Sequence, residues 1–205
     1  MNPLDEYKSK LISIPEAVSK VQSHQTVSVA MAASEPPGLL SELGNHRDRL
    51  EEIKVWVCLP LGAYSFVLDP SMEGHFFIEN WFYGSADRKV HGEGRESYIP
   101  NNLHQSATNK LYAAKNKVNV FFGTATPPDS RGYMSLSLGL VMEKQLIEAA
   151  DLVVLEINEN LPWTLGDTQI HISEVDYVVE NPVAITELQV TPPTEAEEKI
   201  GRFIA

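Results

Sequence analysis

The sequence predicts an α/β protein with a mostly parallel sheet flanked by helices. Two strand–loop–helix–strand units carry this prediction: one runs from "TVSVAMA" to "IKVWVCLP", and the other from "VNVFFG" to "DLVVLEIN". A helix between two strands favours parallel pairing, because the connection recrosses the sheet before the second strand begins. The chain has 205 residues, of which 43% are hydrophobic and 21% charged. That is enough for one well-buried domain.

The first unit follows a predicted helix. Ser13 and Glu16 have capping-box spacing, and Pro15 stands in the first turn, so a helix is expected from there. Residues 26–32 are mostly β-branched or small and predict a short strand. Two prolines and Gly38 then end it, and a helix is expected towards Leu50. Residues 53–60 form the second predicted strand.

The middle of the chain, residues 61 to about 117, has weaker patterns. "FFIENWFYG" is aromatic-rich and predicts a strand, whereas "ADRKVHGEGRESYIPNNLHQ" predicts mostly loop. In the second unit, the loop at 124–140 is expected to lead into a helix whose start Ser135 and Ser137 flank. "TQIHIS" and "VDYVVE" alternate as short strands do.

The last helix is expected to begin near Glu195, because Thr194 and Glu197 have capping-box spacing. Ile200, Phe203 and Ile204 then start an apolar face, and no Gly or Pro ends the helix. We expect the chain to be cut within this helix.

Composition excludes several classes of function. The formal net charge of −12, with scattered Lys and Arg, argues against a nucleic-acid partner. No apolar run approaches the length of a membrane span and no secretory signal is visible, so the expected location is cytoplasmic. The single cysteine, Cys58, is interpreted as a small buried hydrophobe in a strand. With one Cys and no helical His pair, no metal site is expected.

Nucleotide-binding and hydrolase motifs are absent: there is no G-x-x-x-x-G-K-[ST], no G-x-G-x-x-G after a strand and no G-x-S-x-G. "HGEGR" has two glycines but no clear helix behind it, so a phosphate site there is not favoured. His171 is interpreted as a hydrogen-bonded structural residue rather than a catalyst. Tyr98 and Asn101 could line a pocket or cap a turn.

Three loops at predicted carboxyl strand ends, residues 34–38, 124–139 and 158–167, are the candidate binding site. Such ends converge on one edge of a parallel sheet, where ligands are usually held. The long loop combines rigid Pro127 and Pro128 with a turn at Gly132 and several hydroxyl groups. Glu35, in the first loop, could instead be an acid stabilised by a helix dipole.

The segments "VFFGTATPPDSRGYMSLSLGL", "AADLVVLEINENLPWTLGDTQIHISEVDYVVE" and "ASEPPGLL" resemble the amino-terminal domain of the acetyl-CoA hydrolase/transferase family. The resemblance runs from Tyr7 to Ala205 and is strongest between Val118 and Glu180. It implies a CoA-transferase-like fold (the NagB/RpiA/CoA-transferase type) and a cleft between two related domains. "SLSLGL" departs from the single-serine pattern of the family, so Ser135 and Ser137 compete for the matching position.

The resemblance implies a ping-pong reaction through a glutamyl-CoA thioester, with acyl-CoA and a short carboxylic acid such as 4-hydroxybutyrate or acetate as substrates. The nucleophilic glutamate belongs to the carboxyl-terminal domain, so no catalytic residue is expected in this chain, and the isolated chain should be inactive. The residues carried over as pocket wall are Glu35, Pro36, Pro127, Pro128, Gly132, Tyr133, Ser135, Pro162 and Gly166.

CoA is expected as substrate, without a tightly bound cofactor, and the protein is expected to be a homo-oligomer that includes the missing domain. Two other functions stay open. One is an acyl-CoA hydrolase of the same family. The other is a non-catalytic binding module, or a subunit whose partner supplies the glutamate.

Overall fold

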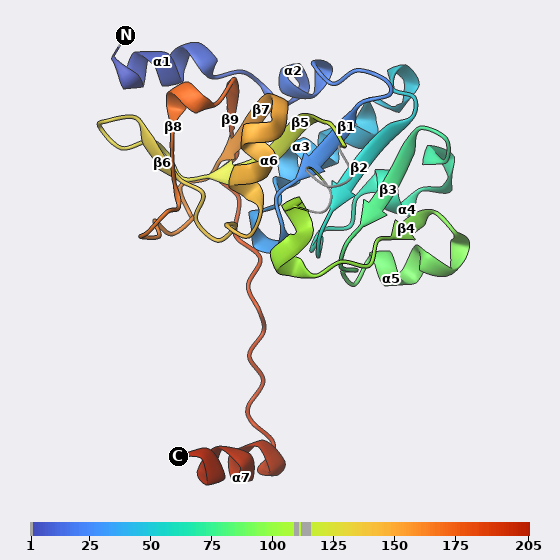
Figure 1. Ribbon diagram of the computed structural model, residues 1–205, viewed down its shortest axis with the longest axis vertical. Helices are drawn as coiled ribbons and strands as arrows, with labels where there is room; N and C mark the ends of the chain where they lie inside the picture. Colours follow the sequence, from blue (N-terminus) through green and yellow to red (C-terminus); the bar gives the residue numbers. More distant parts are fainter. Residues whose placement is uncertain (1, 109–110, 112–115) are drawn as a thin grey trace.

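The structure, a computed structural model, describes residues 2–108, 111 and 116–205. Its centre is a seven-stranded sheet in which every neighbouring pair is parallel, and a separate antiparallel pair joins two short strands. Figure 1 shows these strands with helices on both sides. The predicted fold class is confirmed. In spatial order the strands of the large sheet are β4 (Glu96–Tyr98), β3 (Phe76–Asn80), β2 (Ile53–Val57), β1 (Thr26–Val29), β5 (Val118–Ala125), β7 (Ala150–Ile157) and β9 (Tyr177–Glu180).

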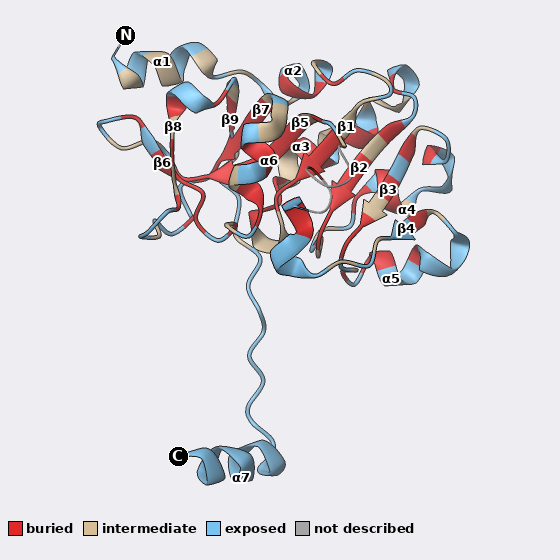
Figure 2. Ribbon diagram, in the orientation of Figure 1, coloured by how far each residue is buried: buried red, intermediate tan, exposed pale blue. Residues whose placement is uncertain are grey.

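Two apolar clusters cover the two faces of the sheet. On β5, Val120 and Phe122 belong to one cluster, whereas Phe121 belongs to the other, as the alternation of side chains along a strand requires. The first cluster packs against α2 (Ile14–Ser19), α3 (Pro37–Asn45) and α4 (Ser65–Leu68). The second packs against α6 (Glu143–Ala149) and the pair β6 (Tyr133–Ser135) and β8 (Gln169–His171). Figure 2 shows the buried residues concentrated in this layered body.

Several predicted boundaries agree with the structure. The Ser13 hydroxyl accepts a hydrogen bond from the Glu16 amide at 3.3 Å, so α2 begins where the capping pattern indicates. The helix after β1 begins at Pro37, the second of the two strand-breaking prolines. The remaining short helices are α1 (Pro3–Lys10), α5 (Asp87–Val90) and single 3₁₀ turns at Ala32–Ser34, Arg47–Arg49, Pro70–Met72, His91–Glu93, Leu103–Gln105 and Ile172–Glu174.

Two predictions for the connections are wrong. The segment 86–105, expected to be mostly loop, contains α5 and the edge strand β4. The segment 124–140 does not lead directly into a helix at Ser135 and Ser137. Ser135 instead ends strand β6, and helix α6 starts only at Glu143. The reason is a long-range pairing: Tyr133 to Ser135 lie opposite His171 to Gln169 on β8.

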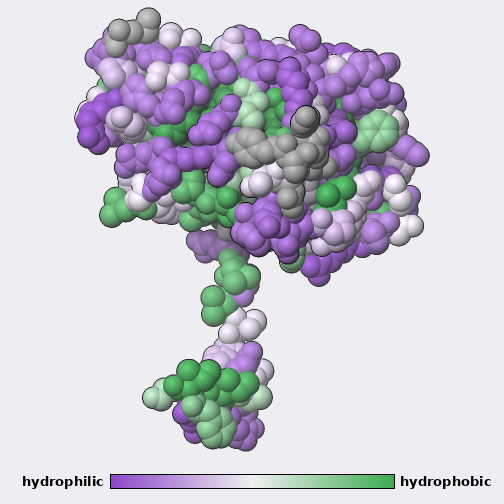
Figure 3. All heavy atoms as spheres, in the orientation of Figure 1, coloured by the Kyte–Doolittle hydropathy of each residue, from purple (hydrophilic) through white to green (hydrophobic). Residues whose placement is uncertain are grey.

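The chain leaves the body after β9 as an extended tail, which carries helix α7 (Glu195–Ile204) at its end (Figure 1). The predicted capping box is present, because the Thr194 hydroxyl accepts from the Glu197 amide and the Glu197 carboxylate accepts from the Thr194 amide. No residue of α7 is buried. Figure 3 shows apolar side chains along the tail and on α7; Val190 and Phe203 are 90% and 89% exposed.

Candidate functional site at the carboxyl edge of the sheet

The strand order reverses between β1 and β5, since β2, β3 and β4 extend from one side of β1 and β5, β7 and β9 from the other. In open parallel sheets, ligands bind outside the carboxyl ends of the strands at such a switch point. The loop after β1 contacts the carboxyl end of β5 there, because the Thr124 hydroxyl donates to the Ser34 carbonyl at 3.0 Å. The tail leaves from this same edge (Figure 1).

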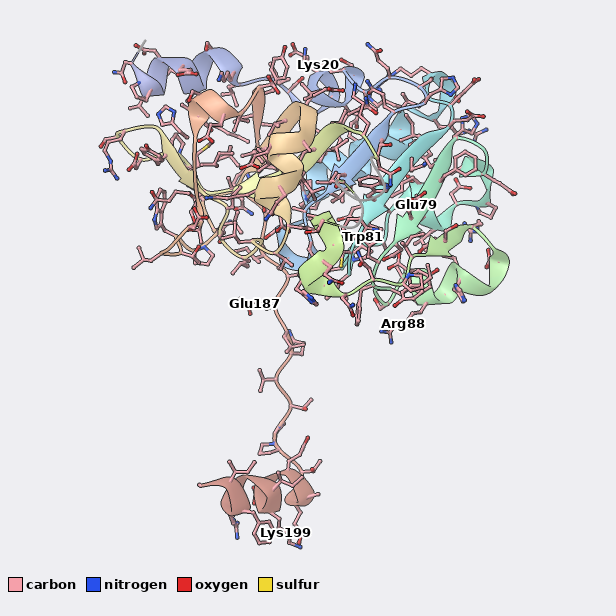
Figure 4. The ribbon with its side chains drawn as sticks, viewed as in Figure 1. Lys20, Glu79, Trp81, Arg88, Glu187 and Lys199 are labelled. Atoms are coloured by element: carbon pink, nitrogen blue, oxygen red, sulfur yellow. The ribbon has the colours of Figure 1, made fainter. Side chains whose placement is uncertain are left out.

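An apolar cavity of about 380 Å³ opens on this edge at the ends of β1 to β4. Each of these four strands is followed by residues that line it. We call it the acyl-side cavity, after the acyl-CoA substrate that the resemblance implies, and its lining residues are Met31, Cys58, Leu59, Trp81, Phe82, Asn101, Asn102, Leu103 and Ser106. Figure 4 labels Trp81 at the end of β3. The volume lies in the range of small-molecule sites, and a mostly apolar wall with a few amide and hydroxyl groups is typical of them.

A much smaller cavity, about 40 Å³, lies at the switch point itself. The loop after β1, strand β5, the loop after β7 and the start of the tail all contribute to it; among its lining residues are Glu35, Thr124, Asn158 and Leu161. A third cavity of about 270 Å³ follows at the ends of β5, β7 and β9, where Pro127 and Pro128 face Tyr7 and Glu180. The three cavities together follow the whole carboxyl edge.

Glu35 is 8% exposed, and its carboxylate accepts hydrogen bonds from the amides of Leu61 and Gly62 at 3.1 and 2.7 Å. Burial raises the pKa of Glu35, and hydrogen bonds from Tyr64 and these amides oppose the rise. The carboxylate therefore joins the loop after β1 to the loop after β2. The alternative interpretation, an acid that stabilises the following helix, does not fit, because α3 receives its carboxylate from another strand.

The carboxylate at the start of α3 belongs to Glu156 on β7, a residue that is 1% exposed. It accepts from the amides of Gly38 and Leu39 at 3.2 and 2.9 Å, and from the Asn181 side chain at 2.6 Å. Burial raises its pKa, and these three donors oppose the rise. A helix amino terminus is a ready anion site. In α3 this position is already filled by a side chain of the protein.

Glu143 makes a third connection of the same kind. Its carboxylate accepts from the amide of Met31 at 3.0 Å and from the amides of Val141 and Met142 at 2.6 and 2.9 Å. Met31 lines the acyl-side cavity, so Glu143 fixes part of the cavity wall. Three buried glutamates thus hold the loops of this edge together, and each has its carboxylate engaged by backbone amides.

The predicted site residues do not all lie in one place. Glu35 and the buried Pro36 lie at the switch point, and Pro127 and Pro128 line the third cavity. Gly132, with φ of 88°, and Tyr133 lie instead against α1 and β8: a Cβ on Gly132 would come 2.6 Å from Pro3, and the Tyr133 ring packs on His171 at 5.0 Å. The turn at Gly132 therefore points away from the edge where the other loops meet.

The other predicted residues tie the long loop to the third loop. Ser135 is fully buried, and its hydroxyl oxygen accepts from the amides of Ser137 and Thr164 at 3.1 and 3.3 Å. The exposed Pro162 takes part through its carbonyl, which accepts from the Ser137 hydroxyl at 2.7 Å. Both serines that compete for the family position thus have structural partners. Gly166, with φ of 102°, is exposed and has open space around it.

Sequence reasoning missed most of the acyl-side cavity. Cys58 is buried as expected, but it also lines the cavity, and burial raises the pKa of its thiol to about 11. Asn101 lines it as well, which favours the pocket over the turn-capping alternative. The sequence feature that could have indicated this cavity is the aromatic pair directly after β3, Trp81 and Phe82. His171 fits its structural interpretation, because its ring nitrogens bond Ser173 Oγ and the Arg131 carbonyl at 2.8 and 3.0 Å.

Within the described part of the chain, no group of three or more His, Cys, Asp and Glu side chains is placed to hold a metal ion. Of the helices that the structure describes, none has the length and apolarity that crossing a bilayer requires.

Known proteins match this chain over nearly its whole length. It is 32% identical over 200 residues to 4-hydroxybutyrate coenzyme A transferase of Clostridium kluyveri, covering 97% of this chain and 46% of that protein. It is 29% identical to succinyl-CoA:cyclohexane-1-carboxylate CoA transferase of Geobacter metallireducens, covering 98% and 45%. The chain thus spans about half the length of the curated relatives it matches.

Solved structures agree. RipA from Yersinia pestis superimposes with a TM-score of 0.90 at 28% identity, covering 100% of this chain and 50% of that one. A 4-hydroxybutyrate CoA-transferase from Porphyromonas gingivalis, at 20% identity and a TM-score of 0.66, shares the fold. The family described as acetyl-CoA hydrolase/transferase N-terminal domain matches residues 1–188. The predicted resemblance is confirmed: the chain belongs to the acetyl-CoA hydrolase/transferase family, of which it carries the amino-terminal domain.

Proposed function

We propose that this chain is the acyl-binding half of a CoA-transferase that moves CoA between an acyl-CoA and a short carboxylic acid. The observation that carries the proposal is the acyl-side cavity, which opens beside the switch point of a sheet whose relatives are CoA transferases. Its apolar wall suits the hydrocarbon part of an acyl group. Asn101, Asn102 and Ser106 offer polar groups for the carbonyl end or a hydroxyl.

The nucleophilic glutamate lies outside this chain in the proposed mechanism. It attacks the thioester carbonyl and expels the CoA thiolate. The thiolate then attacks the mixed anhydride, releasing the first acid and leaving a glutamyl-CoA thioester. An acceptor carboxylate repeats these steps in reverse, so the thioester bond energy is kept. The three buried glutamates of this edge support placing the nucleophile outside this chain, because their carboxylates already accept hydrogen bonds from backbone amides.

The tail supports a second, missing half. Its apolar residues are exposed, with Leu188 and Phe203 both 89% exposed. The superposition with RipA covers this tail in a chain about twice as long. We infer that α7 packs against the carboxyl-terminal half, which brings the glutamate to the cleft. A homo-oligomer of this longer protein, with CoA as substrate and no tightly bound cofactor, completes the proposal.

A separate-subunit organisation is the second candidate. A variant of the decarboxylase AibA/AibB shares the fold, with a TM-score of 0.59 at 14% identity, and this chain covers 91% of that chain. The fold therefore also occurs in a chain of this size. The reading frame after Ala205 distinguishes the two arrangements: continued coding favours one long polypeptide, and a stop codon favours a subunit.

The test is an assay of acyl-CoA with a panel of short carboxylic acids and water. The 205-residue chain is compared with the same chain joined to the polypeptide encoded after it. We expect CoA transfer to acids only with the second half present; release to water in place of acids would make the protein a hydrolase. Acetate-dependent CoA exchange by the chain alone would overturn the proposal. So would a glutamyl-CoA adduct that mass spectrometry maps to Glu35, Glu143 or Glu156.

A further inference from the structure

Two carboxyl groups are buried side by side beneath the wall of the acyl-side cavity. Asp87, on α5, is 1% exposed, and Glu96, the first residue of β4, is 7% exposed. Buried carboxylates are usually paired with a cation. The arginine next in sequence, Arg95, is committed elsewhere, since its guanidinium bonds the Glu93 carboxylate and the Val67 carbonyl.

The surroundings of the pair favour a proton on it. Asp87 accepts from the Gly84 amide at 2.7 Å, and one oxygen of Glu96 accepts from the Asn80 amide group at 3.3 Å. After burial, the charge of Asp87 is the main cause that raises the pKa of Glu96, so the two carboxyl groups act on each other. The second oxygen of Glu96, Oε1, is buried, and no donor group of the described residues reaches it. Ionised carboxylates can only accept hydrogen bonds, so a proton on this pair would reduce the repulsion between the two groups.

This pair is connected to the cavity through one short segment. Asp87 fixes the amide of Gly84, and Gly84 lies so close to the loop after β2 that a Cβ would come 1.9 Å from the Pro60 carbonyl. The Leu59 amide donates to the Phe82 carbonyl at 2.7 Å. Trp81, Phe82 and Leu59 all line the acyl-side cavity. The placement of this wall thus depends on Asp87.

We propose that Asp87 and Glu96 are positioning residues that share one proton, and that this proton holds residues 81–84 against the acyl-side cavity. When the proton is lost, the two negative charges repel, the bond to Gly84 weakens and the wall loosens. The shared proton does not depend on the proposed function. Only the expected effect on the binding of an acyl group rests on the proposed transferase function.

Burial and the charge of Asp87 raise the pKa of Glu96 to about 7, which agrees with this arrangement. The other titratable or charged groups that act on the pair, directly or through Tyr83, are Glu35, Tyr83, His91, Arg95 and Tyr98. Of these, Glu35 adds negative charge near Asp87, and Arg95 partly opposes the shift of Glu96. The pair is expected to titrate as a unit.

The direction of the pH effect follows from proton binding. The folded protein keeps the Glu96 proton to a higher pH than the unfolded chain, where the pKa is ordinary. Stability is therefore fully present below the ordinary range near 4.5, falls as the pH rises towards about 7, and levels off above it.

The test uses the 205-residue chain without any substrate, so its failure is separate from failure of the transferase proposal. Urea unfolding and the hydrogen-exchange protection of the Gly84 amide are followed from about pH 5 to about pH 8.5. The Ala30 amide, which bonds the Phe122 carbonyl within the sheet, is the internal reference. Glu96→Gln keeps a donor facing Asp87 but cannot lose a proton. Glu73→Gln, on the exposed surface, is the matched control.

In the wild type and in Glu73→Gln, we expect the urea midpoint and the Gly84 protection to fall over this range, with a loss of protection on the order of tenfold. In Glu96→Gln both should stay flat. An equal fall in Glu96→Gln, or flat Gly84 protection in the wild type, would overturn the proposal. If Glu96→Gln does not fold, the carboxyl carbon shift of Glu96 in the wild type decides instead: titration near 7 supports the shared proton, and titration near 4.5 refutes it.

Discussion

The two halves of the carboxyl edge are built differently. At the ends of β5, β7 and β9, polar side chains bond the backbone of neighbouring loops, as Ser135 and Glu156 do. At the ends of β1 to β4, aromatic and aliphatic side chains surround an open cavity. In the first half, hydrogen bonds within the protein engage most of the polar groups around a cavity of about 270 Å³, whereas the second half surrounds a larger cavity of about 380 Å³ with a mostly apolar wall.

This difference changes how the family-like segment is understood. The segment Val118 to Glu180 has the most recognisable motifs, yet its hydroxyl and amide groups are largely engaged in structure, as the bonds of Ser135, Ser137 and Asn158 show. The aromatic middle, which has the weakest pattern, supplies Trp81 and Phe82 to the cavity. We infer that the motif-rich half holds the scaffold in place and the other half selects the acyl group.

The largest effect is expected from Glu156→Ala in the scaffold half. The substitution leaves the half-buried amide of Gly38 and the buried amide of Leu39 without an acceptor, and it removes the carboxylate at the start of α3. We expect the free energy of unfolding to fall by about 4 kcal/mol, measured by urea denaturation. Glu156→Gln should lose about half as much, because its amide oxygen still accepts.

Glu148→Ala is the control for that measurement, since this glutamate is exposed on α6 and should change stability by less than about 0.5 kcal/mol. A loss below about 1 kcal/mol in Glu156→Ala would mean that the α3 terminus finds other acceptors. The contrast between the two halves of the edge would then lose its main support.

Gly132→Ala should come next, at about 3 kcal/mol. The backbone has φ of 88°, and the new Cβ would come 2.6 Å from Pro3 and 2.7 Å from the His171 ring. Gly166→Ala is the matched comparison, because its φ of 102° carries the same strain in open space. We expect about 1 kcal/mol there. Equal losses by thermal unfolding would show that packing against α1 and β8 contributes nothing at Gly132.

Ser135→Ala tests whether the family serine is structural. Removing the hydroxyl leaves the amides of Ser137 and Thr164 without their acceptor, so a loss of about 2 kcal/mol is expected. Ser130→Ala, in the exposed turn, should change stability by less than about 0.5 kcal/mol. If Ser135→Ala keeps full stability but abolishes CoA transfer by the longer protein, the serine acts on the substrate and the structural interpretation is wrong.

The parts of the fold that the sequence predicts are those with local signals. The strands β5 and β7 are eight residues long and mostly apolar, and the caps at Ser13 and Thr194 are complete within four residues. The antiparallel strand β6 was missed because its partner β8 lies more than thirty residues later and neither strand exceeds three residues. The edge strand β4 is equally short.

The candidate site was predicted only in outline for the same reason. The acceptor for the Leu39 amide is 117 residues away on β7, and Leu61 binds a carboxylate 26 residues before it. Nothing in the sequence around Glu35 or Glu156 distinguishes a loop-joining carboxylate from a solvated one. A cavity between four strand ends likewise depends on the strand order, which the pattern of each strand does not contain.

The smallest stability effect is expected in the cavity half, from Leu103→Ala. Leu103 lines the acyl-side cavity and is 51% exposed, so its truncation should cost less than about 0.5 kcal/mol. It should nevertheless widen the cavity and shift the preference of the longer protein towards bulkier acyl groups, read as the ratio of kcat/KM values for two acyl-CoAs. Leu165→Ala, at a residue 85% exposed in the third loop, is the control and should leave that ratio unchanged. An unchanged ratio in Leu103→Ala as well would place acyl selection outside this cavity, and the contrast between a scaffold half and a selecting half would fail even if every stability prediction held.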